Sequence, residues 1–223
     1  AKQYYRNKGI ESITVNSSTY AIEFYNYQRM KIKIKYVNRS GRLIIMKYFK
    51  KLVGEKVYLS PKNAEDVEKF TEWLNDFQTT DYIGRSSQVM TLEAEKEYLE
   101  KNLNAEASFF IIEEKTNKLI GTIGLENISH INRKATLGIF IGDKEARNKG
   151  YGTEAINLIL DYGFNYLNLN NIKLDVLGFN ERAIACYKKC GFKEYGRRRE
   201  CVFLNGKYYD TIEMDILAEE FKG

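Results

Sequence analysis

The most informative segment of the chain reads Ile139-Phe140-Ile141-Gly142-Asp143-Lys144-Glu145-Ala146-Arg147-Asn148-Lys149-Gly150-Tyr151-Gly152-Thr153-Glu154-Ala155. An apolar run typical of a strand leads into a loop, the pattern Arg-x-x-Gly-x-Gly follows, and an amphipathic helix begins directly after it. Gly150 and Gly152 allow a tight turn, so that several backbone N–H groups point at one place. The positive end of the helix and the side chains of Arg147 and Lys149 add charge there. The segment therefore predicts a binding site for a pyrophosphate.

The glycine pattern alone is weak evidence, because a glycine-rich turn between a strand and a helix that binds nothing also fits it. The spacing is not that of a P-loop, which needs Gly-Lys-Ser/Thr, nor that of Gly-x-Gly-x-x-Gly. The strand before and the helix after the glycines favour the anion site.

A second segment reads Asn180-Glu181-Arg182-Ala183-Ile184-Ala185-Cys186-Tyr187-Lys188-Lys189-Cys190-Gly191-Phe192. Asn180 follows a predicted strand and can cap a helix. Ala183, Ile184 and Tyr187 then lie on one side of that helix. Gly191 suits the position where a helix ends.

In this order, the two segments resemble the GNAT superfamily of acyl-coenzyme A-dependent N-acetyltransferases, and the resemblance spans about Val57 to Leu217. It looks closest to the spermidine and ribosomal-protein N-acetyltransferase-like branch. The supporting segments are Asp161-Tyr162-Gly163-Phe164, Leu167-Asn168-Leu169 and Phe203-Leu204-Asn205-Gly206-Lys207-Tyr208. The resemblance implies acetyl-coenzyme A (acetyl-CoA) as co-substrate, no metal, and direct attack by a primary amine of a polyamine, a peptide or protein N-terminus, or an aminoglycoside.

The resemblance also implies where acetyl-CoA binds. A strand splayed from its neighbour pairs its free backbone groups with the pantetheine amides, and one N–H polarises the thioester carbonyl. The glycine turn takes the pyrophosphate, and the second segment lies along the pantetheine arm. The implied cofactor-binding residues are Ile139, Phe140, Ile141, Arg147, Asn148, Lys149, Gly150, Tyr151, Gly152, Thr153, Asn180, Ala183 and Tyr187.

Two catalytic residues are expected. Tyr187 occupies the family position whose hydroxyl protonates the departing thiolate, and its reference pKa near 10 keeps it protonated beside a thiol with a pKa near 8.5. A packing role is the alternative, since the chain has 17 tyrosines. For the general base, many relatives have a glutamate where this chain has Thr136. Glu126 or Asn127, near the end of the preceding strand, could hold a water, and Glu126 is our choice, against the equally simple interpretation of an exposed carboxylate at a strand end. A base role for the lone histidine, His130, is less expected than an exposed position in a turn.

The acceptor is the least determined part. In polyamine-acetylating relatives, carboxylates that come partly from the first two helices surround the acceptor. Here the segment between these two helices, Asp81–Ser87, has a single acidic residue and gains Arg85. This argues against spermidine and leaves a peptide α-amine or an aminoglycoside. A non-catalytic acetyl-CoA-binding sensor module and a simple nucleotide-binding protein are the rival functions.

The charge divides the chain in two. Residues 1–45 carry nine basic against two acidic side chains, a net charge of +7, whereas the remaining 178 carry 26 against 28, or −2. We expect a basic extension over residues 1–45 and an acetyltransferase domain over 46–223. Tyr20–Val37 indicates one or two strands. The extension is interpreted either as a solvated segment or as an arm for an anionic partner. A third hypothesis is that translation begins at Met46, which resembles a bacterial start, so that the residues before it are upstream sequence.

Beyond residue 55 the periodicities predict an α+β, or mixed α/β, fold with a mostly antiparallel sheet flanked by helices. Helices are expected at 63–74, with Asn63 as its cap, at 92–103, with Thr91 as its cap, and at 153–167 and 181–190. Strands are expected at 56–60, 109–114, 119–127, 135–141, 173–177, 193–204 and 207–217, the last two forming a hairpin that turns at Asn205-Gly206.

The composition excludes several classes. The three cysteines have neither disulfide nor metal-ligand spacing, and with one histidine and no secretory signal they favour the cytoplasm. No apolar run is long enough to span a membrane. The charge balance beyond residue 45 does not favour nucleic acid. The C-terminal hairpin could join protomers of a homo-oligomer.

Overall fold

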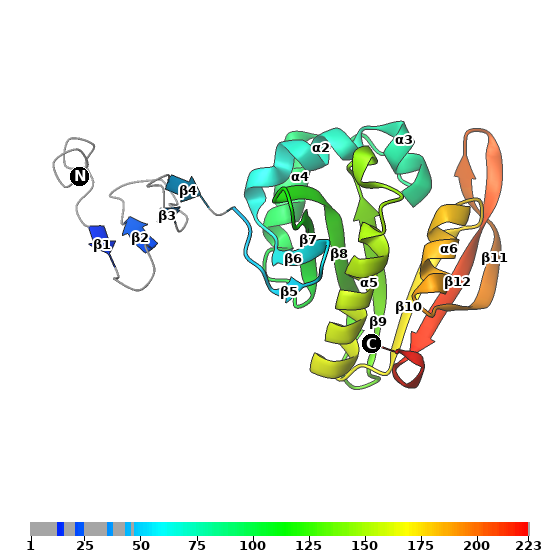
Figure 1. Ribbon diagram of the computed structural model, residues 1–223. Helices are drawn as coiled ribbons and strands as arrows, with labels where there is room; N and C mark the ends of the chain where they lie inside the picture. The colour runs from blue at the N-terminus through cyan, green and yellow to red at the C-terminus, as the bar shows by residue number, and fades with distance from the viewer. Residues whose placement is uncertain (1–12, 16–20, 25–34, 38–42, 46, 223) are drawn as a thin grey trace. The chain divides into compact units, whose positions relative to one another are not determined.

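The computed structural model in Figure 1 describes residues 13–15, 21–24, 35–37, 43–45 and 47–222, which fall into two compact units, Ala1–Phe49 and Lys50–Gly223. In the first unit, β1 (Ile13–Val15), β2 (Ala21–Phe24), β3 (Lys35–Val37) and β4 (Leu43–Ile45) pair antiparallel in that order. Strands are thus present at both ends of the stretch predicted to be extended, while most of the alternating run 31–35 lies outside the described residues. The identity of residues 1–45 as an extension stays a prediction.

The second unit is built on one sheet of eight strands in the order β11-β12-β10-β9-β8-β7-β6-β5. All neighbouring pairs are antiparallel except β9 and β10, which are parallel. The strands are β5 (Leu52–Val53), β6 (Val57–Pro61), β7 (Ser108–Glu113), β8 (Lys118–Ser129), β9 (Lys134–Ile141), β10 (Asn171–Leu177), β11 (Lys193–Leu204) and β12 (Lys207–Leu217). The β11–β12 hairpin has the predicted bounds; its role in joining protomers stays a prediction.

Five α-helices belong to this unit: α2 (Val67–Leu74), α3 (Phe77–Thr80), α4 (Leu92–Lys101), α5 (Tyr151–Asp161) and α6 (Glu181–Lys189). The predicted caps are present. Asn63 accepts from the N–H of Glu65 at 2.9 Å, although this end is the 3₁₀ turn η1 (Ala64–Asp66), and Thr91 accepts from the N–H of Ala94 at 3.2 Å. Helix α3, strand β5 and two further 3₁₀ turns, η2 (Asp81–Ile83) and η3 (Lys144–Ala146), were not expected from the sequence.

The predicted helix 153–167 is wrong at its end. Regular α-helix stops at Asp161, and a π-helical turn, η4 (Tyr162–Tyr166), follows. Gly163 lies so close to the sheet that a Cβ there would come within 2.8 Å of Ile172 and 3.0 Å of Leu125. The chain therefore passes this close contact with the sheet in the wider, π-helical turn, which the periodicity of the sequence alone does not reveal.

Alternate side chains of the central strands cover two different layers. On one face, Ile123 and Leu137 belong to the core that includes Ile156 and Ile159 of α5. On the other face, Phe110 stacks on Phe70 of α2 with ring centroids 5.3 Å apart, and Phe140 meets Trp73 of α2 edge-on. Helix α5 therefore covers one face of the sheet and α2 the other (Figure 1).

The sheet opens between β9 and β10. These strands pair only from Asn171↔Lys134 to Lys173↔Thr136; beyond that point, within these fully described strands, β9 stays with β8 and β10 stays with β12. The predicted fold class, with its splayed strand pair, is confirmed.

Candidate functional site

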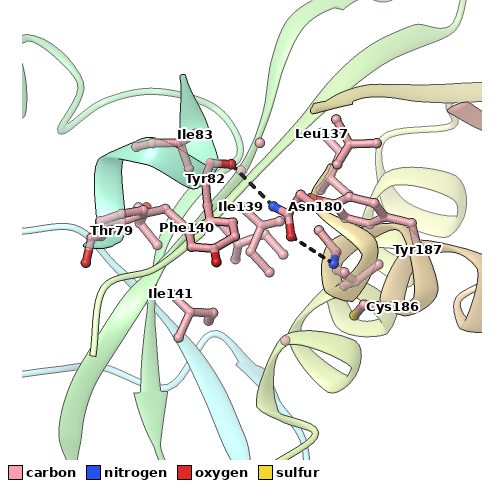
Figure 2. A pocket seen from close by; sticks show the side chains of 18 of the residues that line it. Thr79, Tyr82, Ile83, Leu137, Ile139, Phe140, Ile141, Asn180, Cys186 and Tyr187 are labelled. Atoms are coloured by element: carbon pink, nitrogen blue, oxygen red, sulfur yellow. Dashed lines mark hydrogen bonds between the residues drawn. The ribbon is translucent and has the colours of Figure 1, made fainter. Parts of the chain in front are cut away.

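A cavity of about 790 Å³ occupies the opening between the two strands (Figure 2). Its walls are the diverging parts of β9 and β10, the beginning of α5, one side of α6, and the chain from η2 to α4. Ile139, Phe140 and Ile141, the predicted strand contacts, all line it. Because β9 has lost its partner here, the backbone groups on its β10 side face the cavity and are placed to pair with an extended ligand.

The glycine turn lies at the edge of this cavity. Gly150 has φ of +84°, a left-handed conformation that favours glycine, and α5 begins directly after it. Asn148, also left-handed at φ +62°, precedes the turn. Of the predicted residues Arg147–Thr153, all but Lys149 line the cavity. The first N–H groups of α5 are thus presented to a ligand, as an anion site requires.

Lys56, which the sequence analysis did not identify, adds a positive charge beside this turn. The ammonium of Lys56 lies 3.3 Å from the point where a Cβ on Gly150 would sit. Lys56 is placed there by its own backbone N–H and that of Val57, which donate to the carboxylate of Glu154 on α5 at 2.8 and 3.2 Å. No local pattern could indicate this contact, because it joins segments far apart in the sequence.

Arg147 does not stand free at the turn. Its guanidinium donates to the carbonyl oxygen of Ile141 at 3.2 Å and to the hydroxyl of Thr79 at 3.0 Å. Burial, followed by the nearby charge of Arg182, lowers its pKa from the ordinary arginine value. Arg147 therefore braces the end of β9 against α3, and its charge reaches the anion site from a fixed position.

Tyr151 is similarly engaged. Its hydroxyl donates to the carboxylate of Glu113 at the end of β7, and this bond raises the pKa of Tyr151. The side chain lines the cavity, but its polar end is directed to a protein partner.

Asn180 joins two sides of the cavity (Figure 2). Its side-chain oxygen accepts from the N–H of Ala183 at 3.2 Å, as expected of the cap of α6. Its amide nitrogen donates to the carbonyl of Tyr82 in η2 at 3.3 Å. The Tyr82 ring also lies beside Arg182, 5.4 Å from ring centroid to guanidinium carbon. Segment η2 is thus held against α6, a contact that sequence reasoning did not foresee.

Tyr187 lies on the cavity wall, with its ring centroid 5.9 Å from that of Phe192. Burial of the side chain, and then the neighbouring Cys186 and Cys190, raise the pKa of Tyr187 well above its usual value. The phenol therefore remains protonated at neutral pH, as a proton donor must.

The two cysteines of α6 lie in different environments. Cys190 is buried in the core, but Cys186 lines the cavity, and its sulfur lies 3.3 Å from the hydroxyl of Thr153. The neighbouring Cys190 thiol, opposed by burial, lowers the pKa of Cys186 below that of an ordinary thiol.

Glu126, the predicted base, lines the cavity and lies opposite Thr136, the last residue of β9 that still pairs with β10. Its side chain is exposed, and one carboxylate oxygen lies 3.5 Å from the point where a Cβ on Gly138 would sit. Asn127, the weaker candidate, does not line the cavity. His130 lies outside it too, with Nε2 3.1 Å from Glu106.

Lys62, Glu95 and Tyr98, which the sequence analysis did not assign, line the cavity together with Arg85. Across the described part of the chain, no group of three or more His, Cys, Asp or Glu side chains is arranged to hold a metal ion. No helix of the described residues is long and apolar enough to cross a membrane.

The family model for the acetyltransferase (GNAT) domain matches residues 56–193. The chain belongs to this family. Spermidine N(1)-acetyltransferase of Vibrio cholerae is 40% identical over 118 residues, covering 53% of this chain and 67% of that protein. The Escherichia coli spermidine N(1)-acetyltransferase is 30% identical over 168 residues, covering 75% of this chain and 89% of that protein. The GNAT protein described here thus has named acetyltransferases among its relatives.

A solved structure agrees with the sequence relatives. The crystal structure of spermidine N-acetyltransferase from Vibrio cholerae in complex with CoA and spermine is similar with a TM-score of 0.68 and 30% identity, covering 75% of this chain and 98% of that one. The chain is therefore an acetyl-CoA-dependent N-acetyltransferase, and the rival function of a non-catalytic sensor module is excluded.

Proposed function

We propose that this protein transfers the acetyl group of acetyl-CoA to a primary amine inside the cavity between β9 and β10. The observation that carries the proposal is the separation of these two strands directly beside the glycine turn. An extended thioester needs both features: a strand edge for its pantetheine amides and an anion site for its pyrophosphate.

In this proposal the N–H groups of α5 that follow Gly150 bind the pyrophosphate, with Lys56 and Lys149 as counter-charges. The backbone of Ile139–Ile141 pairs with the pantetheine arm, and one N–H of this strand polarises the thioester carbonyl. Asn180, Ala183 and Tyr187 form the facing wall. The hydrogen bond from Asn180 to the carbonyl of Tyr82 supports this arrangement, because it connects the two sides of the cavity.

The proposed chemistry is a direct displacement. The neutral amine attacks the thioester carbonyl carbon, the new C–N bond forms, and the C–S bond breaks. Tyr187 donates its proton to the departing CoA thiolate, and the proton that the nitrogen loses as it becomes an amide restores the Tyr187 phenol through solvent. The amine starts as an ammonium with a pKa near 10, so its deprotonation at pH 7 costs about 4 kcal/mol and a base is needed. Glu126, through a water, is our assignment for that base.

The relatives bring forward a polyamine as acceptor, because two of them are named spermidine acetyltransferases and one structure contains spermine. Peptide N-termini and aminoglycosides are the other primary amines that the sequence leaves open. All three classes share the reacting group, so one assay covers them.

The test is release of free CoA thiol from acetyl-CoA by the purified protein, offered a panel of polyamines, amino acids, aminoglycosides and peptides. We expect amine-dependent thiol release with at least one class, and an acetylated amine of matching amount in the mass spectrum. Thiol release at the same rate with and without every amine contradicts the proposal.

A further inference from the structure

The cavity contains a buried carboxylate for which the described residues provide no hydrogen-bond or ion-pair partner. Glu95, in the first turn of α4, is only 2% exposed and lines the cavity. Among the described residues, no hydrogen bond or ion pair engages its carboxylate. Burial raises the pKa of Glu95, and the charges of Lys62 and Arg85 act in the opposite direction. A buried carboxylate that faces a cavity without a partner is a group that a ligand N–H can satisfy.

Two cations stand around the same space. Lys62 follows the end of β6, and Arg85 follows Gly84, whose φ of +67° ends the turn η2. Burial lowers the pKa of Lys62, while Glu126 and then Glu95 raise it, so the ammonium lies within the electrostatic reach of both carboxylates. Burial raises the pKa of Tyr98, and the charges of Glu126, Arg85 and Glu95 act on this pKa as well. These side chains therefore surround one volume.

The four charges do not neutralise one another by contact. Within the described part of the chain, neither cation comes within 4.0 Å of either carboxylate as an ion pair. Two positive and two negative groups are thus spaced around a gap, each available to a ligand. An acceptor that carries only ammonium groups would meet two like charges in this gap, which costs affinity.

We propose that the acceptor is a primary amine that also carries a carboxylate: Lys62 and Arg85 bind the carboxylate, Glu95 accepts from a second N–H group, and the reacting amine lies at Glu126. The inference rests on the proposed acetyl transfer for its reaction and adds only the class of acceptor. An α,ω-diamino acid has these three groups on one short chain.

The test compares two molecules that differ by the carboxylate alone, L-lysine and 1,5-diaminopentane (cadaverine), with spermidine as a polycation. Binding to the protein saturated with CoA is measured by calorimetry, which needs no turnover. We expect lysine to bind about tenfold more tightly than cadaverine or spermidine, the factor that one charge-assisted hydrogen bond supplies. Arg85→Gln should reduce this difference, because Lys62 alone then binds the carboxylate, and Arg85→Glu should reverse it.

Arg85 is exposed, so its replacements are expected to fold. Lys96→Gln is the control, since it removes an exposed charge from α4 outside the cavity, and it should leave the lysine preference unchanged. Equal or tighter binding of cadaverine or spermidine to the unmodified protein overturns the inference. So does a lysine preference that Arg85→Gln leaves undiminished, or no binding of any of the three molecules.

The thiol-release assay separates this inference from the proposed function. Turnover of polyamines with no preference for lysine would leave acetyl transfer intact and refute the acceptor class. Preferred binding of lysine without thiol release from acetyl-CoA would support the acceptor class and refute the transfer.

Discussion

At the residue scale, Tyr187 has the two properties that a proton donor to a thiolate needs. It lies on the cavity wall, and its environment raises its pKa, so the proton is present over the whole neutral range. Tyr151 offers a useful contrast. It lines the same cavity, but its hydroxyl already donates to Glu113.

We therefore expect Tyr187→Phe to lower kcat at least about 100-fold while the dissociation constant of acetyl-CoA stays the same, because general acid catalysis is lost and packing is retained. Thiol-release kinetics and an acetyl-CoA titration measure the two quantities. Tyr151→Phe is the matched control and should keep most of the activity. Similar kcat values for the two variants would remove the acid role from Tyr187.

Cys186 leads to a pH-dependent expectation. Because its pKa is lowered, the thiolate forms at a lower pH than in an ordinary thiol, whose pKa is near 8.5. Alkylation of Cys186 by iodoacetamide should therefore rise with pH at lower values than alkylation of an ordinary thiol. CoA should slow it, since Cys186 lines the cavity.

Peptide mass spectrometry identifies the alkylated cysteine, and a Cys186→Ser variant confirms the assignment. A labelling midpoint near pH 8.5, or labelling that CoA does not affect, contradicts this environment for Cys186.

At the scale of elements, the turn before α5 is the part that binding depends on. Gly150 and Gly206 both have positive φ, +84° and +77°, but Gly206 lies in the β11–β12 turn with open space around it. Replacing either by alanine should cost about 1 kcal/mol of folding free energy, because an L side chain is strained there.

Only Gly150→Ala should also weaken the binding of CoA, by at least about tenfold, because the added Cβ contacts Lys56 and shifts the N–H groups of α5. Thermal unfolding and CoA titration of both variants separate the two effects. Equal CoA affinity in the two variants would mean that this turn does not hold the pyrophosphate.

The elements also show what a sequence can and cannot predict. Caps at Asn63, Thr91 and Asn180 and the alternation of β8 and β9 are local patterns, and the elements that they start or define were foreseen. The approach of Lys56 to Gly150, the brace from Arg147 to Thr79 and the tie between Asn180 and Tyr82 join distant segments. No periodicity records such contacts. The place of Glu95 in the cavity wall was missed for the same reason, because on α4 alone it is one of several glutamates.

At the scale of the whole molecule, the GNAT domain and the preceding strands are separate compact units. All cavity residues belong to the second unit. A chain that begins at Lys47 should therefore keep the thermal midpoint of the domain and the rate of thiol release of the full chain. Calorimetry and the thiol assay on both forms check this. Loss of CoA binding on truncation would assign residues 1–46 a part in the site.

The proposed acetyl transfer requires a thioester carrier that lies between β9 and β10 with its diphosphate at Gly150. Calorimetric titration of the purified protein with CoA tests this directly. We expect saturable binding to one site per chain, with little competition from ATP, which lacks the pantetheine arm that β9 would pair with. Absence of saturable binding, or displacement of CoA by ATP at equal concentration, would contradict it.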